Sequence, residues 1–310
     1  MLPILESGEE TLVGGQAVME GVMMRAPHSY CVAVRKPDGE VVMEEMPVTR
    51  PSEKHAYFKW PVIRGLGVLG QSMMLGMKAL QFSANAALDD GSEAEAKPVS
   101  QWMMVAQAIF SVLFFIVLYK LVPLKLTDML ANALPVLKNQ ILFNAVDGII
   151  RLSLFIGFLT LLSRTKDIKR VFEYHGAEHK VVFNFESGQE VNIANAQKFV
   201  TFHPRCGTSF MFVIMLISMV FYMFIPVQTF AAKLAIRIIF LPLIAGVSYE
   251  LIRFAAKRQG SFLNLLTAPG LWTQRITTQP PSDEEVDIAV QALKGAMALE
   301  SKQGGELVIA

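Results

Sequence analysis

The chain has 310 residues, of which 53% are hydrophobic and 18% are charged, and its formal net charge is +1. An ordinary soluble domain carries about 25% charged residues, so this composition argues against a purely soluble protein. A net charge so close to zero excludes a strongly basic surface, and we expect no nucleic acid among the partners. The two cysteines, Cys31 and Cys206, lie in different segments and do not indicate a disulfide framework.

Residues 1–60 are expected to form a cytosolic N-terminal segment that contains a β-hairpin. The hairpin is predicted over residues 30–48, where two β-rich runs flank the turn-forming sequence Pro37-Asp38-Gly39. This segment is too small to form a hydrophobic core alone, so we expect it to pack with other cytosolic parts of the chain.

Residues 14–25 (GGQAVMEGVMMR) are unusually rich in glycine and methionine around two charges. Gln16, Glu20 and Arg25 could line a site here, because glycine allows unusual backbone angles and close approach. The alternative is an ordinary strand and turn with a surface Glu and Arg. Taken by itself, this segment favours that alternative.

Residues 61–97 are expected to form a helix rich in Gly, Leu and Met, followed by a linker. The uncharged core of this helix runs from residue 65 to residue 77, between Arg64 and Lys78. A span needs about 20 apolar residues, so the shorter core indicates an interfacial or re-entrant helix. If the helix crosses the bilayer instead, the N-terminus lies outside the cell.

Four later runs are apolar and long enough to cross a bilayer. They are residues 98–119, 141–163, 206–232 and 234–252. The predicted fold class is therefore mainly α: a polytopic membrane protein with about four transmembrane helices and a small cytosolic α+β part. The helices are expected in two pairs, within residues 98–163 and 206–254, and the lipid bilayer is the first expected partner.

Asp147 and Arg151 interrupt the second predicted span. Ionisable residues inside a membrane are functional candidates by default. Because these two lie four residues apart, they can also neutralise each other on one helix face. We slightly favour this simple ion pair over a role in a transport pathway.

The orientation follows from the lysines and arginines. Residues 164–205 are rich in both, whereas the turn between the third and fourth spans has only Lys233. The positive-inside rule places the 164–205 loop and both termini in the cytosol.

Residues 255–310 are expected to form a cytosolic C-terminal segment with an amphipathic helix. Ser282-Asp283-Glu284-Glu285 has the pattern of a capping box. The apolar positions that follow recur at helical spacing and give the helix one face that can be buried. They are Val286, Ala289, Val290, Leu293 and Met297.

The 164–205 loop and its junction with the third span carry the clearest chemical signal. His175 and His179 in the string His-Gly-Ala-Glu-His lie four apart and share a face of a helix. This H-x-x-E-H order is that of an inverted zincin motif, in which Glu178 would be the general base. His203 and Cys206 are also spaced like zinc ligands.

These four residues predict one divalent metal ion, and the set suits zinc or another borderline metal. Glu186 or Glu190 could substitute for one ligand. The alternative is that the histidines are ordinary polar groups at a membrane surface and that Cys206 is a small buried apolar residue. Three ligands and a water would indicate catalysis, whereas four protein ligands would indicate a structural site.

Three motifs carry a resemblance to a known family. They are GGQAVMEGVMMR at 14–25, YHGAEHK at 174–180 and FHPRCGTSF at 202–210, and WPVIRG at 60–65 also matches. Over about residues 12–300 the chain resembles the YqhQ-like family of bacterial membrane proteins. That family is filed as a domain of unknown function and described as a predicted metal-dependent enzyme, so the resemblance implies a multi-pass membrane protein with a metal.

Three functions follow as hypotheses. The first is a membrane-embedded metal-dependent hydrolase with a site that faces the cytosol, in which Glu178 is the base and Arg205 stabilises a developing anion. The second is a scaffold without catalytic activity, whose metal is structural and which binds a membrane protein or a second copy of itself. The third and weakest is a transporter.

Overall fold

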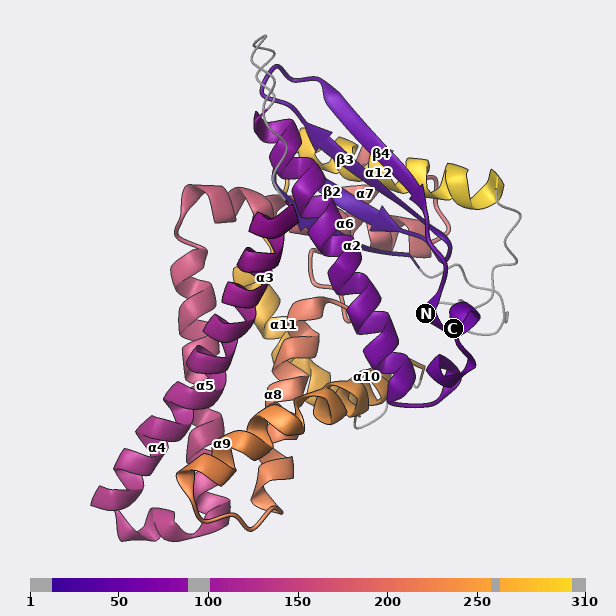
Figure 1. The fold of residues 1–310 in the computed structure, drawn as a ribbon. Coiled ribbons are helices and arrows are strands. Elements are labelled where there is room, and N and C mark those ends of the chain that lie inside the picture. The colour runs from indigo at the N-terminus through magenta and orange to yellow at the C-terminus, as the bar shows by residue number, and fades with distance from the viewer. Residues whose placement is uncertain (1–12, 89–100, 258–262, 303–310) are drawn as a thin grey trace.

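The structure, a computed structural model, describes residues 13–88, 101–257 and 263–302. Figure 1 shows a small sheet with helices on both faces and, extending away from it, an elongated bundle of helices. The predicted linker beyond Leu88 and the first three residues of the predicted span 98–119 lie outside the described residues.

The sheet has four antiparallel strands in the order β1-β2-β3-β4. The strands are β1 (Gly14–Val18), β2 (Gly21–Arg25), β3 (Ser29–Arg35) and β4 (Val41–Pro47). The predicted hairpin is confirmed as β3 and β4, with Val34 opposite Val42 and with Gly39 at a φ of 92° in the turn. The segment 14–25 is a second hairpin, in which Gln16 lies opposite Met23.

Helices cover both faces of the sheet. On one face, Met24 and Cys31 pack against α6 (Lys166–Glu186) and α12 (Asp283–Lys302). On the other face, Met23 and Val32 pack against α2 (Ile63–Leu88). The central strands therefore consist of nearly continuous buried residues and lack the polar alternation of a sheet with one wet face. Burial raises the pKa of the Cys31 thiol to about 12, as expected for an inert structural cysteine.

The helix predicted near residues 61–85 is α2, which follows two short helical turns, α1 (Pro51–Lys54) and η1 (Ala56–Lys59). One side of α2 places Leu75 and Ala79 in the core beneath the sheet. In the part of the chain that the structure describes, α2 is not among the helices apolar and long enough to cross a membrane. Its exposed side carries Met73 and Met74, so its placement at the bilayer surface stays a prediction.

Among the described residues, two helices are long and apolar enough to cross a membrane. The first, Val105–Ala133, combines α3 (Gln101–Ile116), a π-helical turn η2 (Val117–Leu121) and α4 (Val122–Ala133). The second is α5 (Gln140–Leu162), which follows the short turn η3 (Pro135–Lys138) and agrees with the predicted span 141–163. A bent pair, α9 (Phe230–Ile239) and α10 (Leu241–Lys257), makes a third candidate with a 47° angle between its halves.

The predicted number of four spans is therefore not reached: the described residues provide two, or three if the bent pair is one span. The predicted span 206–232 is the apolar helix α8 (Gly207–Met223), which has 17 residues. It ends just before Pro226, which cannot continue a helix because its ring fixes φ and removes the N–H donor. Pro242 similarly follows the break between α9 and α10.

Two further helices return the chain from the bundle to the sheet. The short helix α7 (Ile193–Ala196) lies between α6 and α8 in the chain. After α10, α11 (Leu263–Thr277) packs along α8, and the chain then continues into α12. The predicted capping box is present: the Ser282 N–H donates to Glu285 Oε2 at 2.8 Å, and the Glu285 N–H donates to Ser282 Oγ at 3.3 Å. Val286, Ala289 and Leu293 of α12 are buried against the sheet, as their spacing predicts.

Glu300 ties the end of α12 to the start of β3. Its carboxylate accepts hydrogen bonds from the Ser29 hydroxyl at 2.7 Å and from the His28 backbone N–H at 2.9 Å. Burial alone would raise the pKa of Glu300, but the hydrogen bonds from Ser29 and His28 lower it below its ordinary value. The ionised form therefore stabilises the fold above that ordinary value, and the stabilisation is lost as the pH falls toward the folded-state pKa.

We predict that Glu300→Gln lowers the free energy of unfolding at neutral pH by about 1–3 kcal/mol, because buried donors lose a charged acceptor. Denaturant unfolding of the detergent-solubilised protein measures this change. Glu284→Gln is the matched control, since that side chain is 73% exposed and pairs with Arg35 at the surface. The deficit of Glu300→Gln should shrink in acid, and a deficit that does not depend on pH would contradict the role of the carboxylate.

Candidate metal centre

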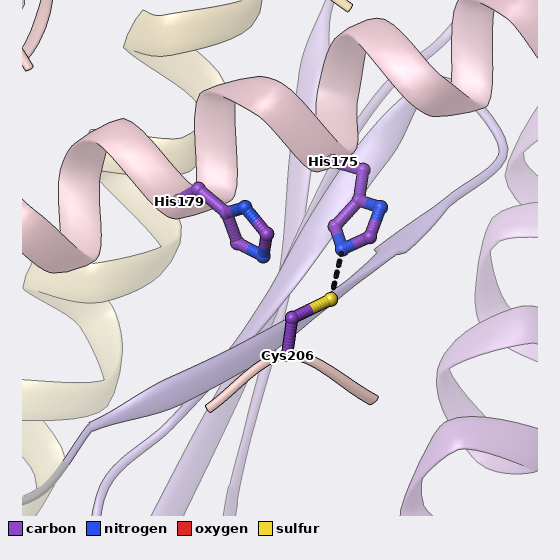
Figure 2. Close-up of side chains that lie close together, drawn as sticks. All are labelled: His175, His179 and Cys206. Carbon is purple, nitrogen blue, oxygen red and sulfur yellow. Dashed lines mark hydrogen bonds between the residues drawn. The ribbon is translucent and has the colours of Figure 1, made fainter. Parts of the chain in front are cut away.

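His175 and His179 project from one face of α6 toward the N-terminal end of α8. Their ring centroids are 4.5 Å apart, one helical turn along α6. Cys206 is the N-cap residue of α8, with extended backbone angles that turn its side chain toward α6. The candidate ligand atoms of these three residues all lie within 4.8 Å of one another. Figure 2 shows both imidazoles and the thiol pointing into the same space.

Hydrogen bonds orient both imidazole rings. His175 Nδ1 lies 2.8 Å from the carbonyl oxygen of Thr277, and His179 Nδ1 contacts the carbonyl oxygen of Thr201. A carbonyl oxygen only accepts, so each Nδ1 carries the proton and each Nε2 keeps a free lone pair. This is the arrangement in which metal-binding histidines are usually held by the groups around them.

The distance between His175 and Cys206 suits two ligands of a small tetrahedral ion. His175 Nε2 lies 3.4 Å from Cys206 Sγ. Ligands about 2.0–2.3 Å from a tetrahedral zinc ion stand about 3.5 Å from one another. The N-terminal end of α8 also favours negative charge at Cys206, because the first turn of a helix presents unpaired N–H groups. The donor set of two imidazoles and a thiolate therefore fits zinc.

Glu178 lies beside this group and is 5% exposed. Its Oε2 is 3.4 Å from His179 Nε2. Space for the carboxylate comes from Gly15 in β1: a Cβ at that position would lie 2.5 Å from Glu178 Cγ. The glycine-rich N-terminal motif and the H-x-x-E-H string thus meet at Glu178, which explains a glycine in the middle of a strand.

His203 does not join the three converging residues, although the sequence predicts it as a ligand. Its Nδ1 accepts the Arg205 backbone N–H at 3.3 Å, and its Nε2 lies 3.4 Å from Glu186 Oε2. Burial lowers the pKa of His203, and the nearby Glu178 carboxylate opposes this only in part. His203 is therefore neutral at physiological pH and lies next to the candidate site, 5.6 Å from the His179 ring between centroids.

Arg205, the predicted anion-stabilising residue, points elsewhere. Its guanidinium donates to Glu186 and to the carbonyl oxygen of Val13. Glu186 thereby links Arg205 and His203 into a separate polar pair beside the group. Glu190, the other acidic residue of this region, is exposed.

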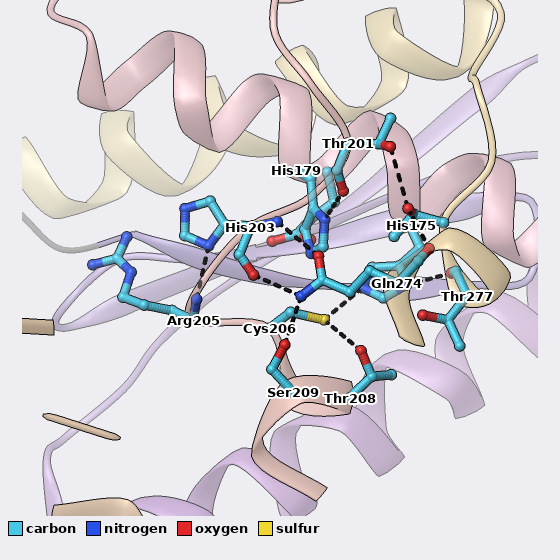
Figure 3. A network of polar contacts seen from close by, with 12 residues as sticks. His175, His179, Thr201, His203, Arg205, Cys206, Thr208, Ser209, Gln274 and Thr277 are labelled. Atoms are coloured by element: carbon cyan, nitrogen blue, oxygen red, sulfur yellow. Dashed lines mark hydrogen bonds and ion pairs between the residues drawn. The ribbon is translucent and has the colours of Figure 1, made fainter. Parts of the chain in front are cut away.

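Sequence reasoning missed the residues that hold the segment between α7 and α8 in place. Figure 3 shows one of them, Gln274, beside His203. The buried Gln274 amide accepts the His203 N–H and donates to the His203 carbonyl oxygen and to Ser209 Oγ, each at 2.7 Å. Lys180 Nζ donates to the carbonyl oxygens of Gln197 and Phe199. No local pattern could have indicated Gln274, and Thr201 and Thr277 act through backbone oxygens, which any residue could supply.

The N-terminal candidates serve separate contacts instead of one site. Gln16 packs over Gly76 of α2, and Arg25 donates to Gln71 and Ser72 of the same helix. Glu20, at the β1–β2 turn with a φ of 52°, accepts a hydrogen bond from Arg170 of α6. Asp147 and Arg151 lie in the bundle, away from the histidines, in contact with α8 and α9.

The fold combines helices suited to a membrane with a layered α/β part, and the histidine cluster lies where the two meet. A family model described as "Protein of unknown function (DUF1385)" matches residues 60–299. The chain is 33% identical over 298 residues to a protein of Bacillus subtilis (strain 168) named "Uncharacterized protein YqhQ", covering 93% of each chain. The protein belongs to this YqhQ-like family, as its motifs predict. No solved structure matches the chain.

Gly176 sets the distance between α6 and the segment that follows α11. A Cβ on Gly176 would lie 2.0 Å from the carbonyl oxygen of Gln279. The Gln279 N–H donates to the Phe172 carbonyl oxygen at 2.9 Å, so this segment runs directly along α6. Thr277, the last residue of α11 just before this segment, supplies the carbonyl oxygen that orients His175.

We predict that Gly176→Ala destabilises the fold by about 1–3 kcal/mol, because the added methyl group forces backbone apart. Thermal unfolding of the detergent-solubilised protein measures the change. Gly70→Ala in α2 is the matched control: nothing lies within 4 Å of the added Cβ, and alanine there should be neutral or slightly stabilising. Equal midpoints for the two variants would contradict the close packing at Gly176.

Proposed function

We propose that this protein is a membrane-bound metal-dependent hydrolase with His175, His179 and Cys206 as metal ligands and Glu178 as general base. The observation that carries the proposal is the convergence of two imidazole Nε2 atoms and one thiol, with both Nδ1 atoms already bonded to carbonyl oxygens. Zinc is the metal that fits this donor set best.

The number of ligands favours catalysis over a purely structural role. Catalytic zinc sites have three protein ligands and one open position, whereas structural sites have four. Among the described residues, the group that converges has three members, and His203 is turned toward Arg205 and Glu186. A fourth position is therefore left for water or substrate.

Glu178 is the residue placed to move a proton. Its buried carboxylate next to His179 Nε2 would accept a proton from a water at the open position and return it to a leaving group. A divalent ion bound there would supply Lewis-acid chemistry for a carbonyl or phosphoryl oxygen. Arg205 would need to leave Glu186 before it could contact a developing anion.

The place of the site suggests substrates near the bilayer. α6 belongs to the sheet core, and Cys206 begins the apolar helix α8, so the candidate ligands bridge the layered part and the bundle. A membrane-anchored peptide, a lipid headgroup or a phosphate ester would reach such a position. We further propose that this side faces the cytosol of a bacterial cell, with both termini, because basic residues concentrate in 164–205.

A scaffold with a structural metal is the second candidate, because the cluster joins segments far apart in the chain. α6, the 201–206 loop and the end of α11 all meet around the histidines. A metal there would fix the sheet region to the bundle, and the surface would then bind a membrane protein or a second copy of the chain.

Metal content distinguishes the ligands. We expect about one zinc per chain by mass spectrometry of the detergent-purified protein, consistent with a single site. His175→Ala and His179→Ala should each lose it, whereas Glu178→Gln, His203→Ala and the exposed-residue control His55→Ala should retain it. Unfolding midpoints confirm that each variant is folded. Retention of metal in both His175→Ala and His179→Ala, or no metal in the wild type, would refute the site.

Glu178→Gln separates the two candidate functions. In a hydrolase, the variant should keep its metal and lose activity by about 10²–10⁴-fold, the usual contribution of a general base. A panel of amide, ester and phosphate-ester substrates provides the assay. In a scaffold, the wild type shows no hydrolysis that depends on metal, and Glu178→Gln leaves metal content and partner binding unchanged.

The orientation is testable with single reporter cysteines. Glu190→Cys should be labelled by a membrane-impermeant reagent only from the cytosolic side, and Val136→Cys, in the turn between the two long helices, only from outside. Both positions are exposed, whereas Cys31 and Cys206 are buried and should contribute little background. Labelling of Glu190→Cys in intact cells would overturn the proposed orientation.

A further inference from the structure

The bundle contains more buried positive charge than its acidic partner neutralises. Asp147 is 1% exposed and contacts two arginines: Arg151 of its own helix and Arg237 of α9, the latter at 2.8 Å. Lys120, in the π-helical turn η2, is also buried. The pair expected from the sequence is therefore part of a larger cluster. The two arginines exceed Asp147 by one positive charge, because guanidinium groups stay protonated.

Neutral groups satisfy part of this cluster without balancing its charge. Arg237 donates to Asn144 Oδ1 at 3.1 Å, and Arg151 donates to Ser218 Oγ at 2.6 Å. The Tyr222 ring lies beneath all three cations, with Lys120 Nζ, Arg151 Cζ and Arg237 Cζ between 5.4 and 5.9 Å from its centroid. Unbalanced charge is costly to bury, so this arrangement calls for an anion.

Two further observations point to a ligand. Arg151 Nε and Tyr119 Oη are buried and have no hydrogen-bond partner among the described residues. Tyr119 and Lys120 both belong to η2, and single π-helical turns within α-helices are frequent at functional sites. The helix is thus locally distorted where the Lys120 ammonium group lies over the Tyr222 ring of the cluster.

A cavity of about 240 Å³ adjoins the cluster at Arg237, Asn144 and Tyr222. Lys233 and Lys138 also line it, together with Asp128, so cations outnumber the acidic residue there as well. Lys233 Nζ is held 3.7 Å from the centroid of the Phe143 ring. The cavity lies near the C-terminal end of α8, whereas Cys206 precedes its N-terminal end, so it is separate from the histidine cluster.

We propose that this cavity binds a phosphate group, with Arg237 as its buried anchor and with Lys233 and Lys138 as further cationic contacts. A phosphate carries about −1.5 to −2 charges at neutral pH, which matches the excess positive charge. Arginine and lysine donors suit the oxygens of phosphate, and the cavity is large enough for the group. The phosphate belongs to a phospholipid headgroup or to a soluble phosphate ester.

Two measurements on the full chain in detergent test this site and identify the source of the phosphate. The first follows the thermal unfolding midpoint against inorganic phosphate, with chloride at equal ionic strength as reference. The second measures phosphorus per chain after extensive washing with phosphorus-free detergent. A saturable, phosphate-specific rise in the midpoint supports the site with a soluble ligand. Phosphorus retained near one atom per chain supports the site with a lipid headgroup.

The variants Lys233→Gln and Lys138→Gln locate the binding, because neither removes a buried partner of Asp147. Loss of a charged hydrogen bond of about 1.5–3 kcal/mol corresponds to roughly tenfold or weaker phosphate binding, or to loss of the retained phosphorus. Lys198→Gln, an exposed lysine bonded to Asn195 in the sheet region, is the control and should match the wild type.

The proposal fails if phosphate and chloride act alike and the washed protein retains no phosphorus. It also fails if Lys233→Gln and Lys138→Gln bind as tightly as the wild type. Arg237→Gln should abolish phosphate binding. If this variant does not fold, Lys233→Gln and Lys138→Gln still test the site. None of these outcomes depends on metal at His175, so the test is independent of the proposed hydrolase.

Discussion

The placement of α6 against the sheet is the constraint on which the candidate site depends. One side of this helix puts Tyr174, Ala177 and Val181 into the core formed with β2, β3 and α12. An adjacent side then has to carry His175 and His179, because residues at these spacings occupy neighbouring faces of the same helix. Glycines allow the contacts on either side: Gly15 of β1 gives room to Glu178, and Gly176 gives room to the Gln279 carbonyl.

Polar contacts, more than apolar packing, fix the second half of the site. Gln274 is fully buried and satisfied by the backbone of His203 and by Ser209. Lys180 bonds two carbonyl oxygens of the 197–199 segment, and burial lowers its pKa. A buried network of this kind is costly unless all its members are paired, so it specifies one conformation of the loop. Cys206 and the Thr201 oxygen are positioned by that conformation.

The bundle contrasts with the sheet region in how its polar groups are arranged. Around the histidines, backbone carbonyl oxygens bond both Nδ1 atoms, and the three candidate ligand atoms converge on one another. In the bundle, two arginines converge on a single aspartate and on one tyrosine ring. The two clusters lie toward opposite ends of α8, a helix about 25 Å long at a rise of 1.5 Å per residue. Each cluster therefore has its own local chemistry, and both contact α8.

Local signals in the sequence were sufficient for the elements themselves. The turn at Gly39, the capping box at Ser282 and the i,i+4 pair of histidines all act within a few residues, so the hairpin, α12 and the shared face of α6 follow from short-range geometry. The long apolar runs predicted the membrane-suited helices, but hydrophobicity alone did not register that Pro226 ends α8 or that α9 and α10 bend. The predicted number of four spans is consequently not confirmed by the described residues.

Long-range contacts decided the rest. Cys206 joins the histidines and His203 does not, because Gln274, distant in sequence, holds the backbone of His203. Asp147 is shared with Arg237 of another helix, which the four-residue spacing to Arg151 could not reveal. Residue type and spacing determined which groups could bind a metal or neutralise a charge. Only the tertiary structure decided which of them meet, because their positions depend on packing between elements far apart in the chain.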